Sequence, residues 1–220
     1  MPLEKSRASS STKKRVRDAE ATKLRILEAA KKEFARNGLE GARVDTIALD
    51  AKANKRMLYH YFKSKDGLFR TVLEREYLNI REEETRLDLE NLPPRTALET
   101  LVRFTWEYYI ANPEFITLVN SENLCQAAHI RNSPTLKTIS QKFVRRIQSL
   151  LDRGVRENVF RDGIDATQLN ITIASINYYY YFTNRFTGSV IFERDFTAPE
   201  ALEERISFNI ETICRLVCKN

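Results

Sequence analysis

The sequence predicts an all-α protein, and three observations lead to that prediction. Only six Gly and six Pro interrupt the 220 residues, too few for an all-β fold that needs a turn about every ten residues. Apolar residues recur at spacings of three and four, the period of an amphipathic helix, and no strand-like alternation competes with this pattern. Hydrophobic residues at 42% and charged residues at 30% are typical of a chain that buries a core.

Charge is distributed unevenly along this chain. Residues 1–65 contain 17 Lys/Arg against 8 Asp/Glu, a net charge of +9, whereas residues 66–220 contain 19 against 22, a net charge of −3. A basic module beside a neutral one is typical of proteins that bind polyanions, because cations that neutralise phosphates release counterions. Residues 1–17 are polar and basic, so we expect a disordered basic arm that orders on an anion.

The first half of the chain contains four expected helices. Gly38 offers a left-handed C-terminal cap to the first, Asn54 an N-cap to the third and Ser64 an N-cap to the fourth. The apolar spacing places these helices at about 19–37, 44–51, 54–62 and 65–86.

In the second half, prolines mark the helix starts, since proline is favoured in the first helical turn. Asp165 with Gln168 and Thr197 with Glu200 have the spacing of capping boxes before two of these helices. We expect helices at about 94–110, 114–124, 134–158, 166–186 and 198–217.

Two short helices joined by a tight turn at residues 44–62 form a predicted helix-turn-helix unit, whose second helix fits the DNA major groove. Its apolar side consists of Met57, Leu58 and Phe62. The opposite side offers polar, basic and aromatic residues: Asn54, Lys55, Arg56, Tyr59 and His60.

At these residues the sequence resembles the TetR family of bacterial transcriptional regulators. The resemblance runs through Ile26-Leu27-Glu28-Ala29-Ala30, Phe34-Ala35-Arg36-Asn37-Gly38, Thr46-Ile47-Ala48 and Leu58-Tyr59-His60-Tyr61-Phe62-Lys63-Ser64-Lys65-Asp66-Gly67-Leu68. It implies an N-terminal three-helix DNA-binding domain at 18–64, joined by a connector helix to a C-terminal helical ligand-sensing and dimerisation domain at 65–220.

The resemblance also implies roles for single residues. Lys55 and Arg56 match the positions that reach base edges, while Tyr59, Tyr61 and Lys65 resemble phosphate contacts. Consecutive helical positions lie 100° apart, so at least one of Tyr59, His60 and Tyr61 must pack inward. The expected DNA-binding set is Arg43, Thr46, Asn54, Lys55, Arg56, Tyr59, His60, Tyr61 and Lys65.

Two positions depart from the family pattern. Lys52 stands in the turn where Gly is common, so either Lys52 adopts a left-handed conformation or the turn has another shape. Arg43 stands where a Ser or Thr cap is common. The tilt of the second helix depends on both.

The family resemblance further implies a homodimer and a ligand pocket in the C-terminal half. Expected dimer contacts on the last two long helices are Tyr178, Phe182, Phe186, Ile206, Ile210 and Ile213, with ordinary intrachain core as the alternative for each. Expected ligand contacts, with core packing again as the alternative, are Phe104, Thr105, Tyr108, Glu122, Asn123, His129, Asn177, Tyr180, Tyr181 and Asn184.

Other classes of protein find little support in this sequence. Cys125, Cys214 and Cys218 form no C-x-x-C pair, and no nucleophile and base have a spacing typical of a catalytic site. We therefore expect no bound metal, no cofactor and no enzymatic activity. The polar N-terminus and the polar residues in the longest uncharged stretch, 166–184, indicate a cytoplasmic protein without a membrane span. The sequence therefore predicts a sequence-specific regulator, most simply a homodimeric repressor released from a palindromic operator by a small-molecule effector; the alternative is a DNA-binding structural or division factor without a ligand.

Overall fold

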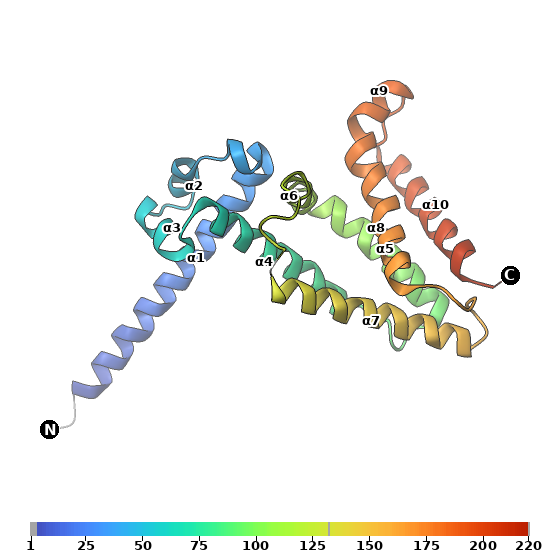
Figure 1. The fold of residues 1–220 in the computed structure, drawn as a ribbon, viewed down its shortest axis with the longest axis horizontal. Helices are drawn as coiled ribbons and strands as arrows, with labels where there is room; N and C mark the ends of the chain where they lie inside the picture. Colours follow the sequence, from blue (N-terminus) through green and yellow to red (C-terminus); the bar gives the residue numbers. More distant parts are fainter. Residues whose placement is uncertain (1–3, 132, 220) are drawn as a thin grey trace. The chain divides into compact units, whose positions relative to one another are not determined.

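The computed structural model describes residues 4–131 and 133–219, and in this part of the chain regular structure is helical (Figure 1). One isolated β-bridge joins Phe160 to Cys218. The N-terminal helices are α1 (Glu4–Gly41), α2 (Val44–Asp50), α3 (Lys55–Phe62) and α4 (Lys65–Thr85). The remaining elements are α5 (Pro94–Ala111), α6 (Pro113–Leu124), α7 (Pro134–Arg156), α8 (Ala166–Tyr178), the π-helix η1 (Tyr179–Gly188), α9 (Ser189–Ile191) and α10 (Pro199–Val217).

The expected start of the first helix was wrong. The helix begins at Glu4, so residues 4–17, expected as a disordered arm, continue α1, while residues 1–3 lie outside the described part. Between Glu4 and Asn37 the sequence contains neither Gly nor Pro, so nothing in it terminates a helix. Gly38 has a φ of 66° and a ψ of 177° and kinks the chain, which confirms a positive φ where the first helix was expected to end.

Helix caps follow the sequence in most places. The side chains of Asn54, Ser133 and Asp165 accept hydrogen bonds from the backbone N–H groups of their own first turns. The capping box at Thr197 was wrong, because the Thr197 hydroxyl donates to Asp195 Oδ1 at 2.7 Å and the first turn of α10 receives no side-chain cap. The expected single helix at 166–186 is also wrong in part, since its second half is π-helical.

The chain divides into two compact units. The N-terminal unit contains Met1–Arg75 and Thr117–Asn132, and the C-terminal unit contains Glu76–Ile116 and Ser133–Asn220. Helices α4 and α6 therefore each contribute residues to both units. The functional boundary expected between residues 64 and 65 stays a prediction.

Each unit has its own apolar core. In the N-terminal unit, the rings of Phe34 on α1 and Phe69 on α4 are fully buried and meet edge to face, with centroids 5.2 Å apart. In the C-terminal unit, α5, α7, α8 and α10 bury one cluster that includes Trp106, Phe143 and Phe160. These cores fix which helix faces remain outside.

Candidate functional site

The turn between α2 and α3 has the geometry that a helix-turn-helix requires. Lys52 adopts a φ of 49°, so of the two alternatives for this turn the left-handed Lys52 is the one found. The N–H of Ala53 donates to the carbonyl of Ala48 at 3.0 Å, and the N–H of Arg56 donates to Asn54 Oδ1 at 2.8 Å. The chain thus ends one helix and starts the next within four residues, Ala51 to Asn54.

Helix α1 supplies caps for α2 that the sequence analysis missed. The backbone N–H of Arg43, the N-cap residue of α2, donates to Oε1 of the buried Glu33 at 2.9 Å, whereas the Arg43 side chain itself forms no cap. At the other end of α2, Arg25 Nε donates to the carbonyl of Ala51 at 3.1 Å. The sequence signal for these bonds was the presence of two charged residues, Arg25 and Glu33, among the apolar residues of the first helix. These two bonds hold α2 at both ends.

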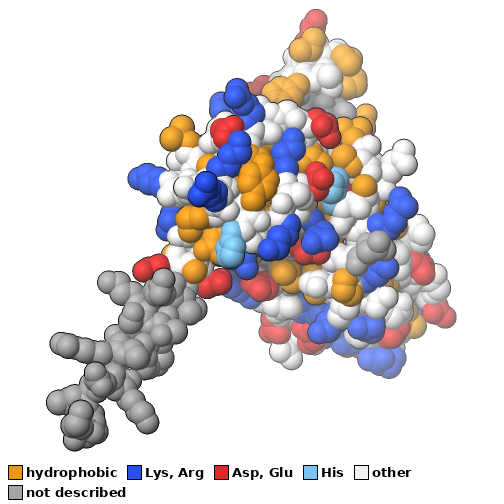
Figure 2. Space-filling view, turned by 60° about the vertical axis from the view of Figure 1, so that its left-hand side comes forward, with side chains coloured by type: hydrophobic (Ala, Val, Ile, Leu, Met, Phe, Trp, Pro, Cys, Tyr) orange, Lys and Arg blue, Asp and Glu red, His pale blue; other side chains and the backbone are white. Residues whose placement is uncertain are grey.

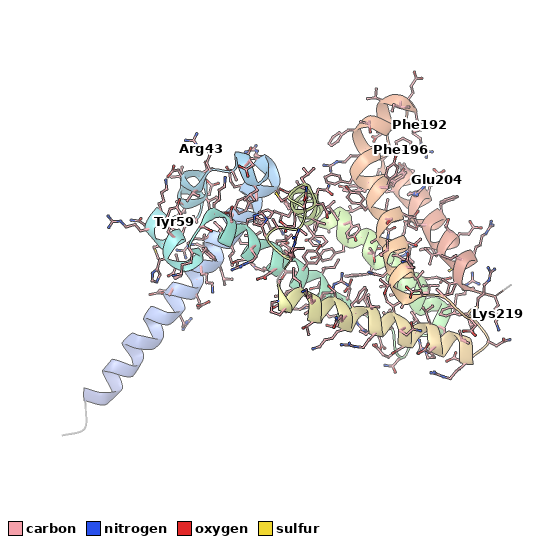
Figure 3. All side chains as sticks on the ribbon, in the orientation of Figure 1. Arg43, Tyr59, Phe192, Phe196, Glu204 and Lys219 are labelled. Atoms are coloured by element: carbon pink, nitrogen blue, oxygen red, sulfur yellow. The ribbon has the colours of Figure 1, made fainter. Side chains whose placement is uncertain are left out.

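Helix α3 presents one polar face to solvent. Leu58 and Phe62 are buried, whereas Arg56 and His60 are exposed and Tyr59 is 44% exposed. Figure 2 shows Lys and Arg side chains spread over one face of the molecule, and Figure 3 labels Tyr59 on α3 together with Arg43 at the start of α2.

Of the three consecutive ring residues on α3, Tyr61 is the one that packs inward. Its side chain is half-buried, with its ring centroid 6.1 Å from that of Phe62. Its ring also meets His60 edge to face at 5.3 Å. Tyr59 and His60 therefore remain on the exposed side.

The predicted DNA-binding cations differ in their surroundings. Lys55 Nζ lies 2.9 Å from Asp45 Oδ1 of α2, and Lys65 Nζ donates to the carbonyls of Glu40 and Ala42 at 3.1 and 3.4 Å. Within residues 4–131 and 133–219, the side chain of Arg56 has no ion-pair partner. Arg43 is exposed and Thr46 half-buried at the start of α2.

Glu122 and His129 form a hydrogen-bonded clamp within the N-terminal unit. Glu122 Oε2 lies 2.6 Å from His129 Nδ1, and Glu122 Oε1 accepts from the N–H groups of His129 and Ile130 at 2.8 and 3.0 Å. The His129 ring packs edge to face on Phe69 at 5.2 Å. Their polar groups are used to hold the loop after α6, and the neighbouring Asn123 is exposed.

Three further predicted ligand residues are buried in the C-terminal unit with partners of their own. Thr105 Oγ1 donates to the carbonyl of Leu101 at 2.9 Å. Asn177, fully buried, donates to the carbonyl of Val102 and accepts from Asn209 at 2.7 Å. The Tyr180 ring packs against Trp106, at a centroid distance of 5.7 Å. For these residues the core alternative describes the structure.

An open groove of about 600 Å³ lies between α5 and α10 in the C-terminal unit. Phe104 is the predicted ligand residue that lines it, with Leu87, Ile210 and Cys214 as other apolar contributors. Tyr108 is buried, its ring 5.7 Å from that of Phe104, and burial raises the pKa of its phenol. Tyr181 is half-buried beneath the Arg185 guanidinium, and the side chain of Asn184 lies outside the described part.

Two of the predicted dimer contacts were wrong. Ile206 and Ile213 are 1% and 0% exposed in the single chain, because the strongest apolar stripe of α10 packs onto its own core. Ile210 is half-buried beside them, whereas Phe186 is 66% exposed and Tyr178 stacks on Phe182 at 5.5 Å. The exposed apolar residues of the same helices that the sequence analysis missed are Ile171, Tyr179, Phe208 and Leu216.

The C-terminal unit also contains a buried carboxyl, Glu84, near the end of α4. Its side chain is 3% exposed and lies 2.6 Å from Arg81 Nη1. Burial raises the pKa of Glu84 to about 7, against the opposing charges of Arg81 and Arg146. A smaller cavity of about 220 Å³ lies beside it, lined also by Phe143 and Lys142.

Family models match parts of both the N-terminal and the C-terminal unit. Residues 26–72 match the model of the bacterial regulatory proteins of the tetR family, and residues 94–213 match that of the tetracyclin repressor-like C-terminal domain. The chain is 38% identical over 194 residues to the HTH-type transcriptional repressor NicS of Pseudomonas putida, covering 88% of this chain and 91% of NicS. The chain belongs to the TetR family.

Other regulators share shorter stretches of sequence or the fold. The HTH-type transcriptional repressor SCO4008 of Streptomyces coelicolor is 34% identical over 153 residues, 70% of this chain and 74% of that protein. The crystal structure of the regulator SCO4942 from the same species superimposes with a TM-score of 0.66 at 26% identity, covering 89% of this chain and 98% of that one. A Saccharomonospora viridis regulator crystallised with choline shares the fold, with a TM-score of 0.68 at 18% identity over 91% and 99% of the two chains.

As a member of the TetR family, the chain is a DNA-binding transcriptional regulator with a helix-turn-helix. The α2–α3 unit lies inside the N-terminal match, and α5 to the middle of α10 lie inside the C-terminal match. In the described part of the chain, none of the helices combines the length and the apolar character needed to span a membrane.

Proposed function

We propose that this TetR-family regulator is a homodimeric repressor that binds a palindromic operator and leaves it when a small molecule binds the C-terminal unit. NicS and SCO4008 are both named repressors, which supports the sign of regulation. The observation that carries the DNA-binding part is α3, whose exposed Arg56, Tyr59 and His60 stand opposite the buried Leu58 and Phe62.

Arg56 is the residue we assign to base recognition. Its guanidinium has no ion-pair partner among the described residues, and it stands in the first turn of an exposed helix. A bidentate contact from Arg to guanine O6 and N7 is worth about 1–3 kcal/mol of discrimination. We assign Tyr59 and Arg43 to phosphates, which position the helix without reading sequence.

Selection of bound duplexes from random DNA, followed by affinity measurements, tests this assignment. Arg56→Ala is expected to lower affinity for the selected duplex by about 5- to 150-fold and to relax the preference at one base pair per half-site. Arg70→Ala, which removes an exposed arginine from α4, is the matched control and is expected to leave that preference intact. A wild-type protein with no preferred duplex would contradict the proposed function.

A second copy is the partner we propose for the outer faces of α8 and α10. Ile171 of α8, Tyr179 of the adjoining η1, and Phe208 and Leu216 of α10 are 44–59% exposed, although each is apolar or aromatic. Two-fold dimers bind pseudo-palindromic sites because each copy reads one half-site. A palindromic operator is therefore expected if the protein is a dimer. Sedimentation of the protein without DNA measures its oligomeric state and so tests the proposed dimer.

For the effector, we propose the groove between α5 and α10 as the site to test first. Its volume of about 600 Å³ falls in the range of small-molecule pockets, about 300–1,000 Å³. The Saccharomonospora viridis regulator, which shares the fold, was crystallised with choline, and this supports the proposal that the C-terminal unit also binds a small molecule. A ligand that releases the operator must prefer the released state, so Phe104→Ala is expected to change the effector concentration needed for release.

The absence of any effector response would favour the alternative, a DNA-binding structural or division factor. The repressor names of the relatives favour the regulator, and they likewise favour a regulator over an enzyme. Titration of small molecules against operator binding separates these functions.

A further inference from the structure

An exposed ion pair connects the two helices of the DNA-binding motif. Asp45 lies in the first turn of α2 and Lys55 is the first residue of α3, and the Nζ to Oδ1 distance is 2.9 Å. Their side chains are 65% and 48% exposed. The hydrogen bond and charge of Lys55, aided by the charge of Arg43, hold the pKa of Asp45 below its ordinary value, so the carboxyl is ionised at neutral pH.

Stability of the motif does not account for this pair. Exposed ion pairs contribute little to folding, since water screens the charges and two side chains must be ordered. Glu33 and Arg25 already hold the two ends of α2, and Asn54 caps α3. The role of the Asp45–Lys55 pair must therefore lie in what the exposed face of the motif binds.

On that exposed face, the Asp45 carboxylate lowers the affinity for DNA of any sequence. Asp45 lies two residues after Arg43, which is assigned to a phosphate, and directly before Thr46 of the expected DNA-binding set. A carboxylate there repels phosphates and neutralises a cation that would otherwise release a counterion from any duplex. Its presence lowers sequence-independent affinity.

The same carboxylate leaves Lys55 able to bind a base. An ammonium group has three N–H donors, and Asp45 accepts from one, so the others remain able to donate to guanine O6 or N7. Because the Asp45 carboxylate holds the ammonium in one place, fewer rotamers are lost when the base contact forms.

We propose that Asp45 is a specificity-determining residue, which positions the ammonium of Lys55 for a base edge and withholds its charge from phosphates of unrelated DNA. This inference rests on the proposed function. It concerns one ion pair within the N-terminal unit and applies whether or not an effector exists.

Affinities of the full-length protein for its selected duplex and for a scrambled duplex, measured across salt concentrations, test the proposal. Asp45→Asn is expected to tighten binding to the scrambled duplex and to steepen its log K against log salt slope by about 0.9 per half-site, because one more phosphate is neutralised. The ratio of specific to scrambled affinity is expected to fall about tenfold.

Asp50→Asn is the matched control. Asp50 is an exposed acid on the same helix without an ion pair in the described part of the chain, and its substitution changes the net charge equally. Equal changes in slope and in affinity ratio for the Asp45 and Asp50 variants would reduce the effect to net charge and overturn the proposal.

A double-mutant cycle with Lys55→Gln supplies the second measurement. In the Lys55→Gln background, Asp45→Asn is expected to leave the affinity ratio unchanged, since the cation that Asp45 positions is gone. Additive effects of the two substitutions would overturn the proposal even if the salt slope changed. A wild-type protein that prefers a duplex while Asp45→Asn retains the full ratio overturns only this inference, whereas a wild type without preference overturns the proposed function as well.

Discussion

On α3 of the N-terminal unit, Arg56, Tyr59 and His60 lie outside, whereas in the C-terminal unit the polar residues singled out on α5 and α8, Thr105 and Asn177, lie inside. Both sets came from the same kind of argument, polar groups beside an apolar stripe. The difference lies in the number of apolar faces. Helix α3 has one, so its polar side must face solvent, while α8 has apolar residues on two faces, such as the buried Ile173 and the exposed Ile171, and only packing decides which face is covered.

The largest effect that tests this comparison is expected at Glu122, a buried carboxylate of the N-terminal unit. Glu122→Ala leaves two partly buried N–H groups and His129 without their acceptor, and we expect a loss of about 3 kcal/mol in the free energy of unfolding. Urea denaturation measures it. Glu122→Gln keeps a carbonyl acceptor for the two N–H groups, so a loss equal to that of the alanine variant would show that the clamp has no such role.

A pH dependence is expected from Glu84 in the C-terminal unit. Its folded pKa of about 7 lies above the ordinary value of 4.5, so the folded state binds the extra proton in between. The unfolding free energy should therefore be greatest, as far as this group contributes, below pH 4.5 and fall by about 3 kcal/mol as pH rises through 7. Denaturation of Glu84→Gln at pH 5, 6.5 and 8 should lack this fall, whereas the more exposed Glu83→Gln should retain it.

A smaller effect is expected on self-association. Phe208→Ser removes an aromatic ring from the exposed face of α10, and we expect the dimer dissociation constant to rise about tenfold, or about 1.4 kcal/mol. Analytical ultracentrifugation measures it, with Leu49→Ser, an exposed apolar residue of the N-terminal unit, as the control. If both variants associate like wild type, the outer face of α10 is not the dimer surface.

The smallest predicted effect is a gain in stability at Lys52. A non-glycine residue at φ 49° is strained by about 1 kcal/mol, and Gly relieves that strain at the cost of a more flexible unfolded chain. We expect Lys52→Gly to raise the melting temperature of the N-terminal unit by about 1–3 °C. Lys52→Ala keeps the strain and loses the charge, so an equal gain in that variant would point to charge rather than to backbone conformation.

Helix starts and ends could be predicted from the sequence in most of the chain, since caps such as Asn54 and Asp165 act on residues two or three positions away. The exposed face of α3 could be predicted as well, because a short helix with one apolar stripe has one way to pack. Three features could not be predicted in this way: the bonds of Glu33 and Arg25 to the two ends of α2, the place of Ile206 and Ile213 in the core, and the pairing of Asp45 with Lys55. Each of these depends on which segments meet in space, and periodicity along one helix contains no information about its neighbours.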